Sequence, residues 1–480
     1  MTTLSKNKTI AIPLLAILAL ALSWAIYMGE FAVIGAIVVL PFVVYIVYLL
    51  FDKPQTGLIL VLILSFIING LGRYITMPFS LFIDGVLLSA VVAALFHSTN
   101  EDYKRLGNIL VLAVSVWMFY TIMEIFNPES IGMLPWFYAS RSVSIYLFIM
   151  VMLTSLIFKT RQSLHVFMII WCIGGIASAA YGIKQSVIGL DSAELAWLAA
   201  GAAQQHVLFG KLRIFSFYSD AGQFGAFMSF TSLTMLIASI RVENFTLRML
   251  YLFTGVITGY GMLISGTRGA LFVYVGAMVY FLLDKNFKTF SIGLFVLGSI
   301  FFLLRFTYIG ASNYNIQRMR SAVRPQDDAS FQVRLENQKK FGEYLSTRPF
   351  GGGIGSSGYW GQRFKPGSFL AETPTDSWFV RIWAETGMVG LVIYIAVLLA
   401  ILVGGFMQIL NLNDIYLKQK LCGIYAGVFG VLVASYGNQV IGQFPTMVVF
   451  GMGLAMIFMG KMLDRERVEE KPLSPGQMAS

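Results

Sequence analysis

Two arginine side chains stand where long apolar runs leave little room for a loop. Arg268 lies in LISGTRGALF (263–272), and Arg213 opens RIFSFYSD (213–220) just ahead of another apolar run. A charge near the bilayer interior costs about 2.5 to 3.5 kcal/mol on insertion scales, so each arginine needs a compensating interaction. One interpretation is that Arg268 caps carbonyls at a helix end or reaches to lipid headgroups. The other is that it binds an anion.

An anion is favoured because further arginines fall on the same predicted side of the membrane. A guanidinium fork donates to two oxygens of a phosphate or carboxylate at once and stays charged at physiological pH. Ser265 and Thr267 add hydroxyl groups beside Arg268. An arginine cluster on the external side of the membrane would therefore suit the diphosphate headgroup of a lipid carrier, which lies at that depth. The additional arginines are Arg73, Arg141, Arg305, Arg318, Arg320, Arg324 and Arg334.

A second polar group occurs in PTDSWFVRIWAETGMVGL (374–391). Asp376 precedes an expected helix, where an aspartate either caps the N-terminus or acts on a substrate. Arg381 and Glu385 are four residues apart, so they can pair along one helix face. Glu385 is otherwise either solvated or functional.

Acidic residues elsewhere are divided by their surroundings. Asp220, with Gln223 three positions later, predicts a capping box and a structural role. Asp84 and Glu124 lie within apolar runs, which makes them functional candidates, although the sequence identifies no partner for either.

The positions of these residues depend on membrane-spanning helices. Hydrophobic residues make up 57% of the 480 positions and charged residues 12%, a composition that excludes a soluble globular domain of this size. Runs of about 20 apolar residues cross a bilayer as helices. We expect an all-α polytopic integral membrane protein with about 12 to 14 transmembrane helices, near 10–28, 31–51, 58–68, 79–96, 109–126, 143–158, 166–183, 221–240, 247–264, 270–283, 290–306, 388–410, 421–434 and 447–462.

The distribution of basic residues predicts the orientation. With a cytoplasmic N-terminus, seventeen lysines and arginines fall in inner loops and tails and six in short outer loops. Both termini are therefore expected inside. The predicted domains are an N-terminal bundle of about eleven spans (1–306), a large external loop (307–385), a three-span section (386–462) and a cytoplasmic tail (463–480).

The large external loop carries most of the polar chemistry. Its segment 330–345 has apolar residues at helical spacing, which predicts an amphipathic helix capped by Asp327, Asp328 or Ser330. The GGGIG run (351–355) lacks the lysine and the flanking strand of a phosphate-binding P-loop, and it predicts a tight turn.

No metal site or disulfide framework is predicted. Cys172 and Cys422 lie in separate apolar runs, and His97, His165 and His206 lack ligand spacing. We expect no cofactor, no metal and no nucleic-acid partner.

Taken together, these parts resemble the O-antigen ligase and O-antigen polymerase superfamily of bacterial envelope glycosyltransferases. The resemblance covers about 212–390 and depends on the order of Arg213, Arg268 after Ser265, a large loop with Arg334 and RPFGGGIG, and ETGMVGL. It implies a multi-pass protein of the bacterial inner membrane with its active site on the periplasmic side. It also implies glycan transfer from an undecaprenyl-diphosphate carrier to a hydroxyl of a glycan or lipid-linked acceptor, without a metal.

The resemblance assigns roles to individual residues. Arg213 and Arg268 would hold the diphosphate and stabilise the leaving group, and Arg334 and Arg381 are further candidates for substrate binding. Ligases of the superfamily carry a histidine where this chain has Asp376, so Asp376 is the candidate base or acceptor-orienting group.

The leading prediction is an inverting glycosyltransferase that polymerises surface polysaccharide. A purely structural assembly partner stays open, and two alternatives with an activity of their own remain. One is a ligase that transfers glycan to lipid A core or to protein, although the missing histidine favours polymerase. The other is a lipid-linked oligosaccharide flippase or exporter, which would need a charged cavity open to both sides.

Overall fold

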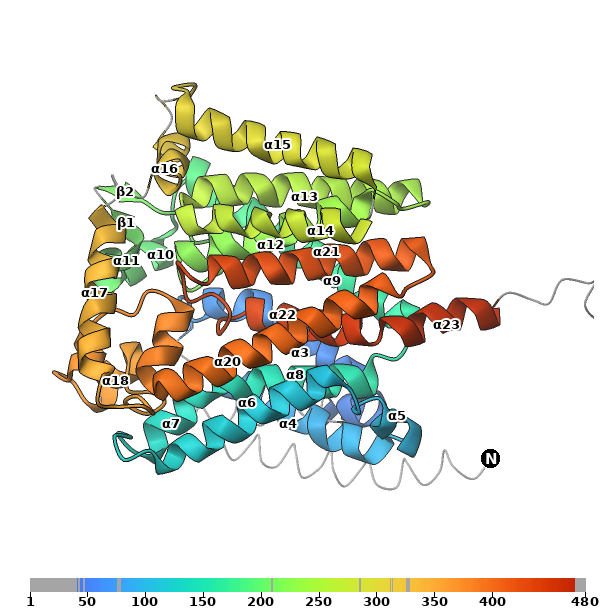
Figure 1. The fold of residues 1–480 in the computed structure, drawn as a ribbon, viewed down its shortest axis with the longest axis horizontal. Coiled ribbons are helices and arrows are strands. Elements are labelled where there is room, and N and C mark those ends of the chain that lie inside the picture. The colour runs from blue at the N-terminus through green and yellow to red at the C-terminus, as the bar shows by residue number, and fades with distance from the viewer. Residues whose placement is uncertain are drawn as a thin grey trace, which may run out of the picture.

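The computed structural model describes residues 41, 44–45, 48–75, 79–208, 210–284, 286–310, 312, 314–324 and 329–470. Long helices run side by side in one bundle, and most of the short elements gather at one of its ends (Figure 1). The helices of the bundle are α3 (Pro54–Leu71), α4 (Phe79–His97), α6 (Ile109–Met123), α8 (Tyr146–Ile157), α9 (Arg161–Val187), α12 (Ala221–Ser239), α13 (Phe245–Ser265), α14 (Ala277–Asp284), α15 (Phe287–Phe306), α20 (Trp378–Leu410), α21 (Ile415–Ala434) and α22 (Thr446–Phe458).

The short elements complete the description. A two-stranded antiparallel hairpin, β1 (Val207–Leu208) and β2 (Lys211–Leu212), pairs Val207 with Leu212. The short helices are α5 (Asn100–Lys104), α7 (Met133–Ser140), α10 (Ser192–Trp197), α11 (Ala203–His206), α16 (Tyr314–Ala322), α17 (Ala329–Leu345), α18 (Gly358–Phe364), α19 (Phe369–Glu372) and α23 (Gly460–Glu470), with 3₁₀ turns at Glu124–Phe126 and Arg268–Gly276 and π turns at Arg141–Ile145 and Leu198–Ala202.

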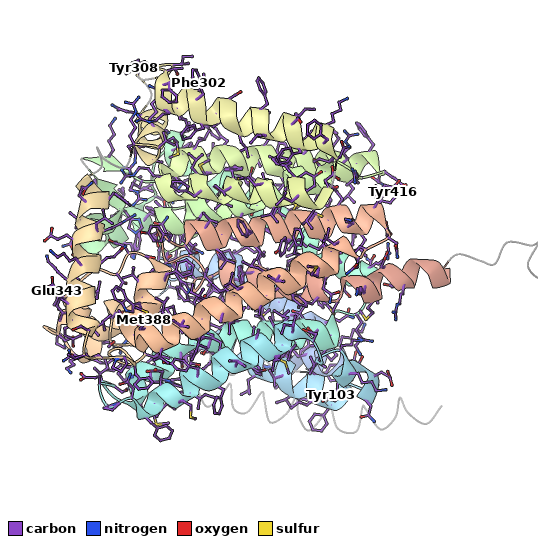
Figure 2. All side chains as sticks on the ribbon, in the orientation of Figure 1. Tyr103, Phe302, Tyr308, Glu343, Met388 and Tyr416 are labelled. Atoms are coloured by element: carbon purple, nitrogen blue, oxygen red, sulfur yellow. The ribbon has the colours of Figure 1, made fainter. Side chains whose placement is uncertain are left out.

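The predicted all-helical membrane fold is confirmed. Within the described residues, nine helices are long and apolar enough to span a membrane, or ten if the bent pair 446–458 and 460–466 counts as one span. Exposed apolar side chains such as Phe302 and Met388 lie on the outside of the bundle, where a soluble protein would be polar (Figure 2).

Individual predicted spans differ from the observed helices. The run 270–283 begins as the 3₁₀ turn Arg268–Gly276 and becomes α-helical only in α14, and the apolar part of α15 is short. The run 388–410 belongs to α20, which already begins at Trp378, ahead of the expected domain boundary at 386. The first predicted span, and most of the second, lie outside the described residues.

Helix α12 lies in the interior of the bundle, and 94% of its most apolar 18-residue stretch is buried. The neighbouring turn Arg268–Gly276 packs tightly on α21, because a Cβ on Gly276 would overlap the Ala426 carbonyl and one on Gly430 would overlap the Val273 carbonyl. Small residues allow such close backbone contact in membranes. The packing fixes the position of Arg268 at the start of the turn.

The end of the bundle that carries the β-hairpin, α16, α17 and α18 is called the α17 end (Figure 1). Here the GGGIG run packs into a break in α20 at Gly387, whose φ of +66° and ψ of −168° suit glycine alone. The Gly352 N–H donates to the Ala384 carbonyl over 3.0 Å, and the Val389 N–H donates to the Pro349 carbonyl over 3.2 Å. The glycine run is therefore a structural turn, as predicted.

The predicted helix over 330–345 is observed as α17. Phe341 and Leu345 are buried against Leu370 and Val380, but Leu335 is 41% exposed and does not share their contacts. Ser330 is the second residue of the helix and does not precede it, so its predicted capping position is wrong. The other two predicted caps, Asp327 and Asp328, lie outside the described residues.

Candidate functional site

A cavity of about 540 Å³ lies at the α17 end. Its walls come from the segment after β2, the turn after α13, α16, α17, the start of α20 and the residues after α21. Four residues selected from the sequence line it, namely Arg213, Arg268, Arg334 and Asp376. These four residues are up to 163 positions apart in the chain, from 213 to 376.

Arg268 is positioned by the end of α13. Gly266 adopts a left-handed conformation with φ of +59°, which terminates the helix, and the Thr267 N–H donates to the Ser265 hydroxyl over 3.1 Å. The Arg268 Nη1 then donates to the Ser321 hydroxyl of α16 over 3.2 Å. The SGTR string is therefore a helix C-terminus that directs an arginine towards the cavity.

Arg213 is tied to the same turn. Its Nη2 donates to the Thr267 hydroxyl over 3.1 Å, and that hydroxyl donates to the Ala221 carbonyl at the start of α12 over 2.7 Å. Asp220 caps α12 by accepting from the Gln223 N–H over 2.9 Å, as predicted. The Gln223 side chain donates to the Thr446 hydroxyl, so the second half of the predicted capping box is absent.

Asp376 stands in a left-handed backbone conformation with φ of +48°. The Ser377 N–H donates to the Thr375 carbonyl around it, which makes a three-residue turn. Ser377, not Asp376, occupies the N-cap position of α20. Asp376 Oδ2 instead lies 3.5 Å from the Nε of Arg334, and both side chains are partly exposed to the cavity. Aspartate tolerates this conformation better than most residues, so the turn holds its carboxylate towards α17.

Arg381 does not line the cavity. Its Nε lies 3.2 Å from Glu385 Oε1 within α20, which confirms the predicted i, i+4 pair. Glu385 is fully buried and also accepts from the Ser357 hydroxyl over 2.7 Å. This pair holds the loop after the GGGIG run against the break in α20.

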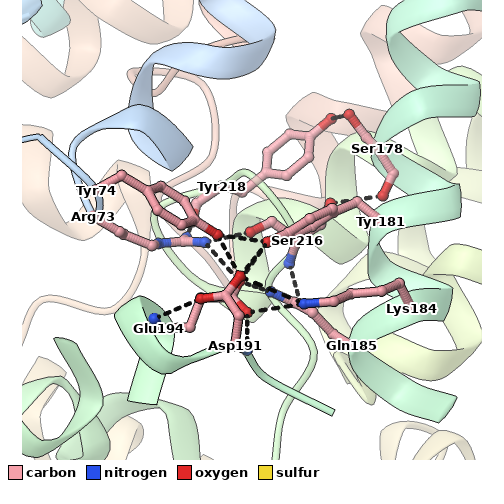
Figure 3. A network of polar contacts seen from close by, with 10 residues as sticks. All are labelled: Arg73, Tyr74, Ser178, Tyr181, Lys184, Gln185, Asp191, Glu194, Ser216 and Tyr218. Carbon is pink, nitrogen blue, oxygen red and sulfur yellow. Dashed lines mark hydrogen bonds and ion pairs between the residues drawn. The ribbon is translucent and has the colours of Figure 1, made fainter. Parts of the chain in front are cut away.

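Arg73 belongs to a separate buried network at the α17 end (Figure 3). It donates to the Ser216 and Tyr218 carbonyls and lies 3.9 Å from Glu194 Oε1. Its guanidinium also packs on the Phe215 ring. Burial lowers the pKa of Arg73 to about 10, which leaves it charged at neutral pH. Arg73 thus fixes the segment that follows Arg213.

The acidic side of this network comes from the N-terminus of α10, where Asp191 is the N-cap and Glu194 lies in the first turn (Figure 3). Glu194 accepts from Gln185 over 2.6 Å, and Gln185 Oε1 accepts from the Ser216 N–H over 2.8 Å. Burial raises the pKa of Asp191, but the hydrogen bond from Tyr74 and the charge of Lys184 outweigh it and hold that pKa at about 2. The carboxylates of Asp191 and Glu194 and the amide of Gln185 therefore hold the segment around Ser216 in place.

Other arginines of the predicted outer set have structural partners. Arg141 pairs with Asp84 over 2.5 Å, and Tyr146 donates to the same carboxylate. Arg320 and Arg324 donate to the carbonyls of Ile309 and Arg305. The predicted cluster thus divides into arginines that line the cavity and arginines that hold the fold.

Asp84 and Glu124 were candidates without partners, and the structure supplies both. Glu124 accepts from the Asn127 amide over 2.7 Å, and that amide also donates to the Phe350 carbonyl over 2.7 Å. The contact links the end of α6 to the glycine-rich loop.

Sequence reasoning missed several cavity residues. Arg318 was noted only as one of many arginines, although it lines the cavity from α16. Asn337 lies three residues after Arg334, so helical spacing placed the two on one face of α17. Asn438 follows α21 in an irregular segment, where no local pattern pointed to it.

The fold and the cavity define a multi-span membrane protein with a strongly basic cavity at one end of its helical bundle. Residues 253–395 of this multi-span membrane protein match the family described as O-antigen ligase. The match runs from α13 into α20 and includes Arg268, Arg334, Asp376 and Arg381, whereas Arg213 precedes it. No curated protein matches the chain.

Proposed function

We propose that the protein transfers a glycan from an undecaprenyl-diphosphate carrier to a hydroxyl acceptor, and that it joins repeat units of a surface polysaccharide. One observation carries the proposal: Arg213, Arg268, Arg334 and Asp376, from four separate segments, line a single cavity. The volume of about 540 Å³ is in the range of small-molecule sites. The match of residues 253–395 to the O-antigen ligase family supports lipid-linked glycan as the substrate class.

In this proposal Arg213 and Arg268 bind the diphosphate. As the bond between the anomeric carbon and the phosphate oxygen breaks, negative charge grows on the leaving undecaprenyl diphosphate. Positioned cations stabilise such charge, and loss of a single donor costs about 100- to 1000-fold in rate in other enzymes. The hydrogen bond from Arg213 to Thr267 ties the first guanidinium to the residue directly before Arg268.

Asp376 is the proposed general base. It accepts the proton of the acceptor hydroxyl while that oxygen attacks the anomeric carbon from the face opposite the leaving group, which inverts the configuration. Arg334 orients the Asp376 carboxylate. We assign Arg381 a positioning role through Glu385, because it does not line the cavity.

We further propose that the α17 end faces the periplasm and that both termini are cytoplasmic. The excess of lysine and arginine in loops at the opposite end supports this orientation. The described arginine-lined cavity lies at one end only, which fits a transferase better than a flippase.

A ligase is the second candidate, because the matching family is described as O-antigen ligase. Polymerase is preferred because Asp376 stands where ligases of the superfamily carry a histidine. Incubation of the purified protein with a lipid-linked repeat unit, followed by electrophoresis, distinguishes them. A ladder indicates polymerase, a single shifted band with an added acceptor indicates ligase, and unchanged donor in both assays contradicts the proposal.

A further inference from the structure

A second, smaller cavity adjoins the one described above. It has a volume of about 180 Å³ and lies among the ends of α9 and α13, strand β2 and α16. Arg213 and Arg318 line both cavities and so stand between them. Lys211 lines only the smaller one.

The two cavities together are strongly cationic. Their described lining residues include five cationic side chains, Lys211, Arg213, Arg268, Arg318 and Arg334, against one carboxylate, Asp376. That carboxylate lies beside Arg334, on the far wall contributed by α17 and the start of α20. Arg213 and Arg318, which line both cavities, therefore place two guanidinium groups at the boundary between them.

The chain brings Arg318 to this boundary by close packing. Gly266, with φ of +59°, ends α13, and a Cβ at this position would lie 3.4 Å from Arg318 Cδ. The Ser321 hydroxyl on the same helix accepts from Arg268 over 3.2 Å. Helix α16 thus contributes a cation of its own and also orients the arginine of the neighbouring turn.

Building on the proposed function, we propose that the smaller cavity is a second anion subsite that takes one phosphate group. Lys211, Arg213 and Arg318 form it, and the other phosphate of the diphosphate lies in the larger cavity beside Arg268. Arg213 and Arg318 contact both groups because they lie between them. The three cations around this cavity suit a tetrahedral oxyanion.

Two sources of this phosphate share the same chemistry, namely the headgroup of the carrier and free phosphate. The proposal predicts that the protein distinguishes a polyprenyl diphosphate from a polyprenyl monophosphate through Lys211. Equilibrium binding of both lipids to the purified full-length protein measures this directly. Lys211→Gln should weaken binding of the diphosphate lipid by about 10- to 100-fold and change binding of the monophosphate lipid by no more than about 2-fold.

Two matched variants frame the measurement. Arg318→Gln should weaken both lipids, because Arg318 lines both cavities. Lys365→Gln removes an exposed lysine that lines neither cavity and should change neither affinity. Competition with inorganic phosphate distinguishes the two sources. If the subsite also binds free phosphate, added phosphate should weaken binding of the diphosphate lipid and leave binding of the monophosphate lipid unchanged.

A purely structural reading makes a different prediction. Basic side chains near the ends of α9 and α13 also neutralise the partial negative charge of helix C-termini. In that case Lys211→Gln lowers thermal stability and leaves the preference for the diphosphate unchanged, which overturns the subsite. Wild-type protein that binds neither lipid overturns the proposed function itself, so the two failures are distinguishable.

Discussion

The guanidinium of Arg213 donates to the hydroxyl of Thr267, a residue 54 positions later in the chain and directly before Arg268. A single threonine therefore holds the two arginines of the proposed diphosphate site in register. Its hydroxyl also donates to the Ala221 carbonyl, which fixes the threonine itself.

Thr267→Val keeps the shape of the side chain and removes the hydroxyl. We expect kcat/KM for glycan transfer to fall about 10-fold, since a hydrogen bond to a charged group contributes about 1.5 to 3 kcal/mol. Thr267→Ser retains the hydroxyl and should recover most of the activity. Equal activity of the valine and wild-type proteins would show that Thr267 does not position Arg213.

Arg213→Ala and Arg268→Ala remove the proposed ligands of the diphosphate. Each should reduce transfer by about 100-fold or more, because leaving-group charge loses a positioned cation. Membrane insertion and thermal unfolding should remain close to wild type. Arg363→Ala is the matched control, since Arg363 is exposed on α18 and outside the cavity. Wild-type turnover in the Arg213 and Arg268 variants argues against the site.

Asp376→Asn preserves size and removes the proton acceptor. General-base catalysis contributes about 100- to 10,000-fold, so kcat should fall by at least about 100-fold with little change in donor binding. Arg334→Gln breaks the same ion pair while keeping the carboxylate, and it should cost less. If kcat falls by the same modest factor in both variants, Asp376 acts through its ion pair with Arg334 and not as a general base.

His206 predicts acid sensitivity of the α17 end. Its ring is buried beside Trp197 and Phe215, and burial lowers its pKa from 6.5 to about 4. The folded state therefore favours the neutral ring, so this stabilisation is complete above about pH 6.5 and is lost as the pH falls towards 4. The Arg213 N–H donates to the His206 carbonyl over 2.8 Å, which couples the ring to the site.

The free energy of unfolding of the wild type should fall by about 2 kcal/mol between pH 7.5 and pH 5 because of His206, and thermal unfolding at a series of pH values measures this. His206→Phe keeps the ring packing and should flatten that part of the profile. An unchanged pH dependence in the phenylalanine variant would assign the acid sensitivity to other groups.

Gly387→Ala tests the break in α20. A Cβ there would overlap the Pro349 carbonyl, and the backbone conformation is unfavourable for alanine, so we expect a loss of more than about 2 kcal/mol in the free energy of unfolding. Gly85→Ala in α4 is the control, because its Cβ would meet nothing within 4 Å. Alanine at that helical position should be neutral or slightly stabilising.

The amino-acid sequence by itself determined the membrane class, most of the described spans and α17, and it made Arg213 and Arg268 the leading candidate site residues. These features depend on hydropathy summed over about 20 neighbouring residues, on helical spacing and on charges placed beside apolar runs, all of which are local properties. The resemblance to the O-antigen ligase family also came from the order of short strings along the chain, and the family match confirms it.

Only the tertiary structure decided which charges face the cavity. Arg73 and Arg318 have the same side chain and the same predicted side, yet one is buried under Trp197 and Phe215 and the other lies between two cavities. From the sequence, Asp376 could equally have been a helix cap, but in the structure its left-handed turn places the carboxylate beside Arg334. The partner of a guanidinium is set by the packing of segments far apart in the chain, and no local pattern carries that information.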